Sequence, residues 1–125
     1  MSEQISVLVI EDEEHIRNIL EYNLRSDGFD VYLAEHGLRG VELAREKRPD
    51  VILLDWVMPK MDGLEVLSEL KRDRRTKRIP VFMLTVKDDE DDVRRALNEG
   101  ADWYFTSLLA TQPNSDSRLK ACLNH

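Results

Sequence analysis

The most informative segment of the chain is Val51-Ile52-Leu53-Leu54-Asp55, in which four consecutive apolar residues run directly into a carboxylate. Proline stands on either side of this segment, at Pro49 and Pro59. A short apolar run with such limits predicts a strand that is buried on both faces of a parallel sheet. Asp55 is its last residue, and open α/β sheets bind their ligands at that end of the strands. A single acidic residue there more often caps a turn, so its neighbours decide its role.

Composition predicts one ordinary globular domain. The chain has 125 residues, of which 42% are hydrophobic and 34% charged, and this length suffices for one buried core. No apolar run approaches the ~20 residues that cross a bilayer, so we expect no membrane segment. The polar residues 1–4 predict no signal peptide. A single cysteine, Cys122, fits a reducing compartment, so we expect a cytoplasmic protein.

Charge and histidine placement argue against two kinds of site. The net charge of −7 and a pI of about 5.0 argue against direct binding of nucleic acid, whose phosphates attract basic surfaces. The three histidines are scattered without the spacing of a metal site: His15, His36 and His125.

Apolar runs and helical periodicities predict five strands that alternate with helices. The expected strands cover residues 5–10, 29–34, 51–55, 80–85 and 102–106. The expected helices cover residues 14–26, 37–47, a segment containing 64–70, and 88–98. Such alternation predicts a parallel sheet with right-handed crossovers and helices on both faces. No linker or repeat divides the chain, so these elements form one domain.

Three of the predicted strands end in side chains that can carry chemistry. Glu11 and Asp12 follow the first strand, Asp55 ends the third, and Thr85 ends the fourth. Three neighbouring carboxylates repel one another, so they require either raised pKa values or a bound cation. Oxygen ligands with room for water and phosphate oxygens suit Mg²⁺. A carboxylate beside such an ion can attack a phosphoryl group and form an aspartyl phosphate, and Thr85 can donate its hydroxyl to a phosphoryl oxygen.

Taken together, these motifs resemble the receiver domain of two-component response regulators, the CheY-like superfamily. The resemblance covers residues 5–106, and we therefore expect a receiver core over residues 1–106. The matching segments are Val-Leu-Val-Ile-Glu-Asp-Glu at 7–13, Asp-Val-Ile-Leu-Leu-Asp-Trp at 50–56, Met-Pro-Lys-Met-Asp-Gly at 58–63, Phe-Met-Leu-Thr at 82–85 and Glu-Gly-Ala-Asp-Trp-Tyr at 99–104.

This resemblance implies a flavodoxin-like (βα)5 fold, doubly wound, with strand order 2-1-3-4-5. It implies that Asp55 accepts a phosphoryl group from a phosphohistidine on a sensor histidine kinase. Thr85 would be the switch hydroxyl and Tyr104 the aromatic switch. The domain would be a signalling module, not an enzyme, with at most self-catalysed phosphotransfer and dephosphorylation. The implied Mg²⁺ ligands are Glu11, Asp12, Asp55 and the backbone carbonyl of Val57.

The segment after the fifth strand departs from the family pattern. Receiver domains carry a Lys-Pro pair there, and the lysine donates a charge-assisted hydrogen bond to the phosphoryl group. This chain has Ser107-Leu108 instead, and residues 107–125 form a divergent tail. We expect the last helix to be short, atypical or rearranged, and a homodimer that exchanges this segment is one outcome.

Two origins of the tail stay open. Codons for Lys-Pro-Phe become Ser-Leu-Leu, the residues at 107–109, when one base is lost, so one hypothesis is a frame shift that removed an output domain. The other is a naturally divergent receiver that acts on a separate downstream protein.

The sequence leaves three rival functions. Haloacid-dehalogenase-like hydrolases require a second Asp two residues after the nucleophile, where this chain has Val57. A nucleotide- or flavin-binding module requires a Gly-rich or hydroxyl-rich first loop, whereas the acidic residues 11–14 would repel phosphate. The alternative with most support is a receiver that acts through protein contacts without phosphorylation, because Ser107 replaces the lysine.

Overall fold

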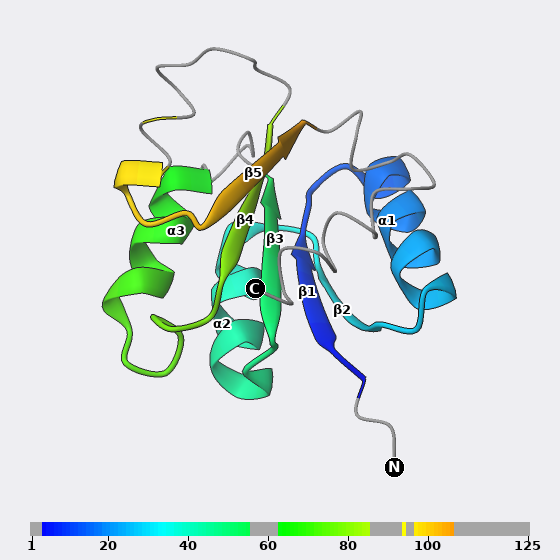
Figure 1. Cartoon of the computed structure of the whole chain (residues 1–125), viewed down its shortest axis with the longest axis horizontal. Helices are drawn as coiled ribbons and strands as arrows, with labels where there is room; N and C mark the ends of the chain where they lie inside the picture. The colour runs from blue at the N-terminus through cyan, green and yellow to red at the C-terminus, as the bar shows by residue number, and fades with distance from the viewer. Residues whose placement is uncertain (1–3, 56–62, 86–93, 95–96, 107–125) are drawn as a thin grey trace.

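The computed structural model describes residues 4–55, 63–85, 94 and 97–106, with the backbone alone at 85 and 103–106 (Figure 1). Within these ranges no helix has the length and apolar character needed to cross a membrane. The predicted helix over 88–98 lies largely outside the described residues, and the tail 107–125 lies wholly outside them. The elements are β1 (Ser6–Ile10), α1 (Glu14–Ser26), β2 (Asp30–Ala34), α2 (Gly37–Lys47), β3 (Val51–Asp55), α3 (Gly63–Arg72), β4 (Val81–Thr85) and β5 (Trp103–Thr106).

The five strands form one parallel sheet in the order β2-β1-β3-β4-β5, which confirms the predicted topology. β1, β2, β4 and β5 each begin one residue later than predicted. The residue before a strand can take part in the hydrogen bonding between strands without belonging to the strand itself. The carbonyls of Ile5 and Pro80, for example, accept hydrogen bonds from the N–H groups of Asp30 and Ile52.

The starts of β1 and β3 are joined by side-chain hydrogen bonds as well as by backbone pairing. The backbone N–H and the Oγ of Ser6 donate to Oδ2 of Asp50, at 2.8 and 3.1 Å. In return, the backbone N–H of Asp50 donates to the Ser6 carbonyl at 2.9 Å. This exchange fixes which residue of β1 faces which residue of β3.

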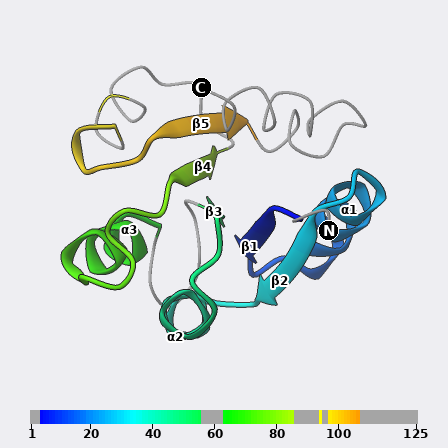
Figure 2. The same cartoon turned by 60° about the horizontal axis from the view of Figure 1, so that its bottom comes forward.

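The sheet separates two apolar clusters, because successive side chains of a strand point to opposite faces. α2 and α3 cover one face and α1 covers the other (Figures 1 and 2). The α2–α3 cluster includes Leu8, Ile10, Val41, Ala44, Ile52, Leu54, Val66, Leu67, Leu70 and Met83. The α1 cluster includes Val7, Val9, Leu20, Leu24, Phe29, Val31, Val51, Leu53, Phe82 and Leu84. β1 and β3 contribute to both clusters, which explains their continuous apolar sequences.

α2 approaches the sheet closely at Gly40. A Cβ atom at this position would lie 2.4 to 2.9 Å from three side-chain atoms of Ile10, so glycine is the residue that lets α2 pack against β1. α1 ends as the sequence predicted, at Asp27 and Gly28. Gly28 has a φ of 91° and its N–H donates to the Arg25 carbonyl, which closes the last turn.

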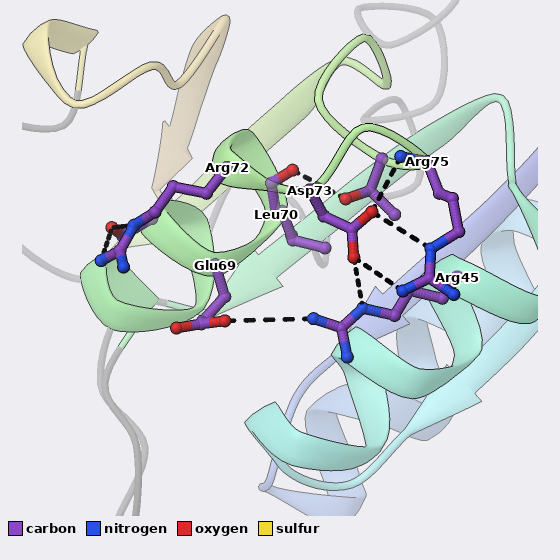
Figure 3. Close-up of polar contacts among 8 residues, drawn as sticks. Arg45, Glu69, Leu70, Arg72, Asp73 and Arg75 are labelled. Atoms are coloured by element: carbon purple, nitrogen blue, oxygen red, sulfur yellow. Dashed lines mark hydrogen bonds and ion pairs between the residues drawn. The ribbon is translucent and has the colours of Figure 1, made fainter.

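Charged side chains join α2 to the segment after α3 (Figure 3). Arg45 on α2 donates from Nε to Oδ2 of Asp73 at 2.7 Å. Nη2 of Arg75 lies 3.0 Å from the same oxygen. Hydrogen bonds from the Arg75 side chain and backbone, followed by that from Arg45, hold the pKa of Asp73 well below its usual range. A second, longer ion pair joins Arg45 to Glu69 at 4.0 Å. These contacts connect the two helices at the rim of their shared apolar cluster.

Arg48→Gly is expected to stabilise the protein. Arg48 follows α2 with φ 44° and ψ 62°, a left-handed conformation that strains a residue carrying a Cβ atom. The strain costs about 1–2 kcal/mol, which exceeds the entropy that glycine adds to the unfolded chain, so the free energy of unfolding should rise by about 0.5–1 kcal/mol, as measured by urea denaturation. Arg48→Ala is the control, because it removes the same charge and keeps the strain. A gain that is equal in both variants would assign the effect to charge.

Candidate functional site

Strand register brings the predicted functional residues to one edge of the sheet. Ile10 pairs with Leu54, so the residues that follow them, Glu11 after β1 and Asp55 at the end of β3, lie at the same level. Asp55 in turn pairs with Leu84, the residue before Thr85 on β4. The edge is therefore built by β1, β3 and β4 together, at their carboxyl ends.

Three carboxylates converge at this edge. Glu11, Asp12 and Asp55 each place one carboxylate oxygen within 4.8 Å of the others, close enough for one metal ion to contact all three. The three residues differ in burial, since Glu11 is only 2% exposed while Asp12 and Asp55 are partly exposed. The predicted acidic cluster is thus assembled by the fold, with one carboxyl group held out of water.

The pKa of Glu11 is raised to about 8, and burial is the largest cause. The nearby charge of Asp55, a hydrogen bond to the Asp55 side chain and the charge of Asp12 contribute to the same rise. The backbone N–H of Glu13 opposes this shift, because it donates to Oε1 of Glu11 at 3.1 Å. Burial beside two other carboxyl groups therefore favours the protonated form of Glu11 when no cation is bound, which relieves the repulsion within the cluster.

Two residues that contact the β1–α1 connection carry no role in the sequence analysis, Glu13 in the connection itself and Arg17 on α1. Glu13 is the N-cap of α1, and its carboxylate accepts from the N–H groups of His15 and Ile16 at 3.3 and 2.8 Å. Arg17 donates from Nη1 to the carbonyls of Glu11 and Asp12. Glu is an unusual N-cap, so the sequence held only a weak signal for Glu13.

Of the other predicted site residues, the structure describes only the backbone of Thr85 and Tyr104. The backbone of Thr85 pairs with Thr106, one residue beyond the Asp55–Leu84 pair, so Thr85 lies at the same edge. The backbone of Tyr104 pairs with Met83, two residues earlier along β4 than Thr85. Val57, whose backbone carbonyl was an expected metal ligand, lies outside the described residues, as does Ser107.

Comparison with known proteins agrees with this fold. The family model of the response regulator receiver domain matches residues 7–111, which is most of the chain. The protein belongs to this family, and is a receiver domain of two-component signalling.

Solved structures of receiver domains superpose along almost the full length of the chain. The chemotaxis protein CheY4 of Vibrio cholerae is 26% identical with a TM-score of 0.84, and the match covers 98% of each chain. The response regulator domain of Thermotoga maritima CheB is 29% identical with a TM-score of 0.83, again over 98% of each chain.

A third similar structure holds a metal ion. The receiver domain of a Pseudomonas aeruginosa sensor histidine kinase is 27% identical with a TM-score of 0.82, over 98% of this chain and 96% of that one. That structure was solved with a magnesium ion coordinated in its active-site cleft.

Glu11→Gln is expected to remove a pH dependence from the stability of the metal-free protein. Because the pKa of Glu11 is raised from about 4.5 to about 8 on folding, the folded state binds this proton more tightly than the unfolded state. The resulting stability is present below about pH 4.5 and is lost as the pH rises through 8. Between these limits the wild type should lose on the order of 2–4 kcal/mol relative to the variant.

Urea unfolding in EDTA at a series of pH values measures this difference. Glu14→Gln is the control, because Glu14 is an exposed carboxylate three residues further along the chain. Parallel pH profiles for the wild type and Glu11→Gln would mean that Glu11 has an ordinary pKa in the folded protein.

Proposed function

We propose that this receiver domain accepts a phosphoryl group on Asp55 from a phosphohistidine of a sensor histidine kinase, with Mg²⁺ as cofactor. The observation that carries the proposal is the convergence of Glu11, Asp12 and Asp55, whose carboxylate oxygens lie within 4.8 Å of one another. Membership of the receiver family supports it, because the acidic cluster stands where the chain matches the family.

The chemistry of the cluster fits Mg²⁺. Carboxylate oxygens are the ligands that this ion prefers, and it retains positions for water and for a phosphate oxygen. The raised pKa of Glu11 supports a cation site, since a divalent ion offsets the cost of ionising three neighbouring carboxylates. In the proposed site Glu11, Asp12 and Asp55 hold the ion together with the carbonyl of Val57. The bound ion would screen the repulsion between the Asp55 carboxylate and the incoming phosphoryl group.

In the proposed step a carboxylate oxygen of Asp55 attacks the phosphorus atom of the donor. A P–O bond forms as the P–N bond to the imidazole breaks, and the imidazole nitrogen keeps the electron pair and takes a proton from solvent water. Asp55 suits this role because it ends a fully buried strand, which holds its backbone fixed while the side chain stays partly exposed. Thr85 would then donate its hydroxyl to a phosphoryl oxygen, and Tyr104 would respond as the aromatic switch.

A second function has support from the sequence. Ser107 stands where receiver domains carry the lysine that contacts the phosphoryl group, so we expect one charge-assisted contact with the modified Asp55 to be missing. The second proposal is therefore a receiver that acts through protein contacts independently of phosphorylation. In either case we place the receiver core at residues 1–106 and treat residues 107–125 as a divergent tail.

Incubation with Mg²⁺ and acetyl phosphate should add one phosphoryl group to the protein, detected by intact mass spectrometry. Asp55→Asn should abolish the adduct, because the amide is not a nucleophile. Asp30→Asn is the control, since Asp30 is an exposed carboxylate at the opposite end of the strands and should leave the adduct unchanged. A wild type without any adduct would favour the phosphorylation-independent function.

Asp12→Asn should weaken Mg²⁺ binding by about tenfold or more, which corresponds to about 1.4 kcal/mol. The reason is the loss of one anionic ligand from a cluster of three. Isothermal titration calorimetry measures the Kd, and Glu14→Gln again serves as the control because it changes the net charge equally. Equal affinities in the wild type and Asp12→Asn would remove Asp12 from the metal site.

A further inference from the structure

Arg17 contacts the loop that carries two of the three clustered carboxylates. It lies in the first turns of α1 and is half-buried, and its backbone N–H donates to the carbonyl of the N-cap Glu13 at 2.9 Å. Its guanidinium turns back along the helix. Nη1 donates to the Glu11 carbonyl at 2.9 Å and to the Asp12 carbonyl at 3.3 Å. One side chain thus contacts the backbone of two consecutive site residues.

These contacts complete a set of restraints on a short connection. The N–H of Glu11 donates to the Ala34 carbonyl of β2, and the N–H of Glu13 donates to the carboxyl of Glu11. The first bond ties Glu11 to the sheet, and the second ties Glu13 to Glu11 within the loop. Arg17 acts from the helix, and its bonds set the orientation of the peptide groups that follow Glu11 and Asp12.

We propose that Arg17 is a positioning residue, which orients the backbone of Glu11 and Asp12 so that their carboxylates and that of Asp55 form one cation site. This inference rests on the proposed function, because it assigns Arg17 a role in the Mg²⁺ site proposed there. Mg²⁺ demands near-octahedral geometry with short bonds to oxygen, so small displacements of two ligands weaken binding. Outer contacts of this kind typically contribute 10–100-fold to metal affinity.

Charge and geometry predict opposite effects of removing Arg17. The guanidinium carries a positive charge next to the loop, and a positive charge opposes the binding of a cation. If Arg17 acted only through its charge, its replacement by a neutral residue would strengthen Mg²⁺ binding. If Arg17 acts by orienting the loop, the same replacement weakens Mg²⁺ binding. The sign of the change therefore separates the two roles.

Arg25 provides a matched control on the same helix. Its guanidinium also donates to a backbone carbonyl, that of Val31 at 3.1 Å, and Nε pairs with Glu21 at 3.0 Å. Arg25 lies in the last turn of α1, whereas the two cluster residues that Arg17 contacts, Glu11 and Asp12, lie just before the first turn of that helix. Arg25→Gln thus removes the same charge and a similar hydrogen bond without touching residues 11–12.

The test is calorimetric titration of Mg²⁺ into the wild type, Arg17→Gln, Arg17→Lys and Arg25→Gln, with urea unfolding of each metal-free protein. We expect Arg17→Gln to raise the Kd by about tenfold, and Arg17→Lys to raise it less, because an ammonium group restores part of the hydrogen bonding. Arg25→Gln should leave the Kd unchanged even where it lowers stability. Backbone amide NMR shifts of residues 11–13, without Mg²⁺, should move in Arg17→Gln and stay in place in Arg25→Gln.

Every other outcome contradicts either the positioning role of Arg17 or the metal site itself. An unchanged or lower Kd in Arg17→Gln overturns the positioning role, as does an equal rise in Arg25→Gln, which would reflect loss of helix stability. If Arg17→Gln does not fold, Arg17→Lys decides, and a Kd equal to that of the wild type overturns the role. A wild type that binds no Mg²⁺ overturns the proposed metal site itself, and the positioning role with it.

Discussion

The register between β1 and β3 is the constraint on which the rest of this domain depends. Both strands are apolar on both faces, so alternation of polar and apolar side chains cannot fix their alignment. The alignment is fixed instead at the strand starts, where Ser6 and Asp50 exchange backbone and side-chain hydrogen bonds. A shift of one residue would exchange the side chains assigned to the two apolar clusters and move Glu11 away from the level of Asp55. The acidic edge is thus determined by contacts at the far end of the same strands.

The acidic cluster destabilises the folded state locally, and the rest of the fold compensates for it. Glu11 is buried beside two other carboxyl groups, and its raised pKa measures how unfavourable ionisation is in that position. Asp73 shows the opposite arrangement, because two arginines stabilise its charged form and lower its pKa. The charged contacts of Asp73 connect α2 to the segment after α3, whereas Glu11, Asp12 and Asp55 bring three carboxyl groups together at one edge of the sheet. A cluster of carboxyl groups in which burial raises a pKa is typical of a binding site.

Much of this fold could be predicted from the sequence, because its strands and helices carry strong local patterns. The apolar runs that end at Ile10 and Asp55 gave the central strands, and α1 and α2 have the predicted bounds. Convergence of Glu11, Asp12 and Asp55 followed from the rule that parallel strands end at one edge. Arg17 and the burial of Glu11 could not be predicted, since both depend on how the loop after β1 turns. No periodicity encodes the direction of that turn.

The division of the core into two separate clusters affects how this sequence can diverge. A change of volume on the α1 face is felt first by neighbours such as Leu20 and Phe82, while Leu67 and Met83 lie across the sheet. Compensating substitutions can therefore accumulate on each face separately, with the strand backbones as the shared boundary. Such a boundary preserves the positions of the strand ends even when most side chains have been replaced. Sequences with little more than a quarter of their residues in common can then keep the same fold, as the similar receiver structures do.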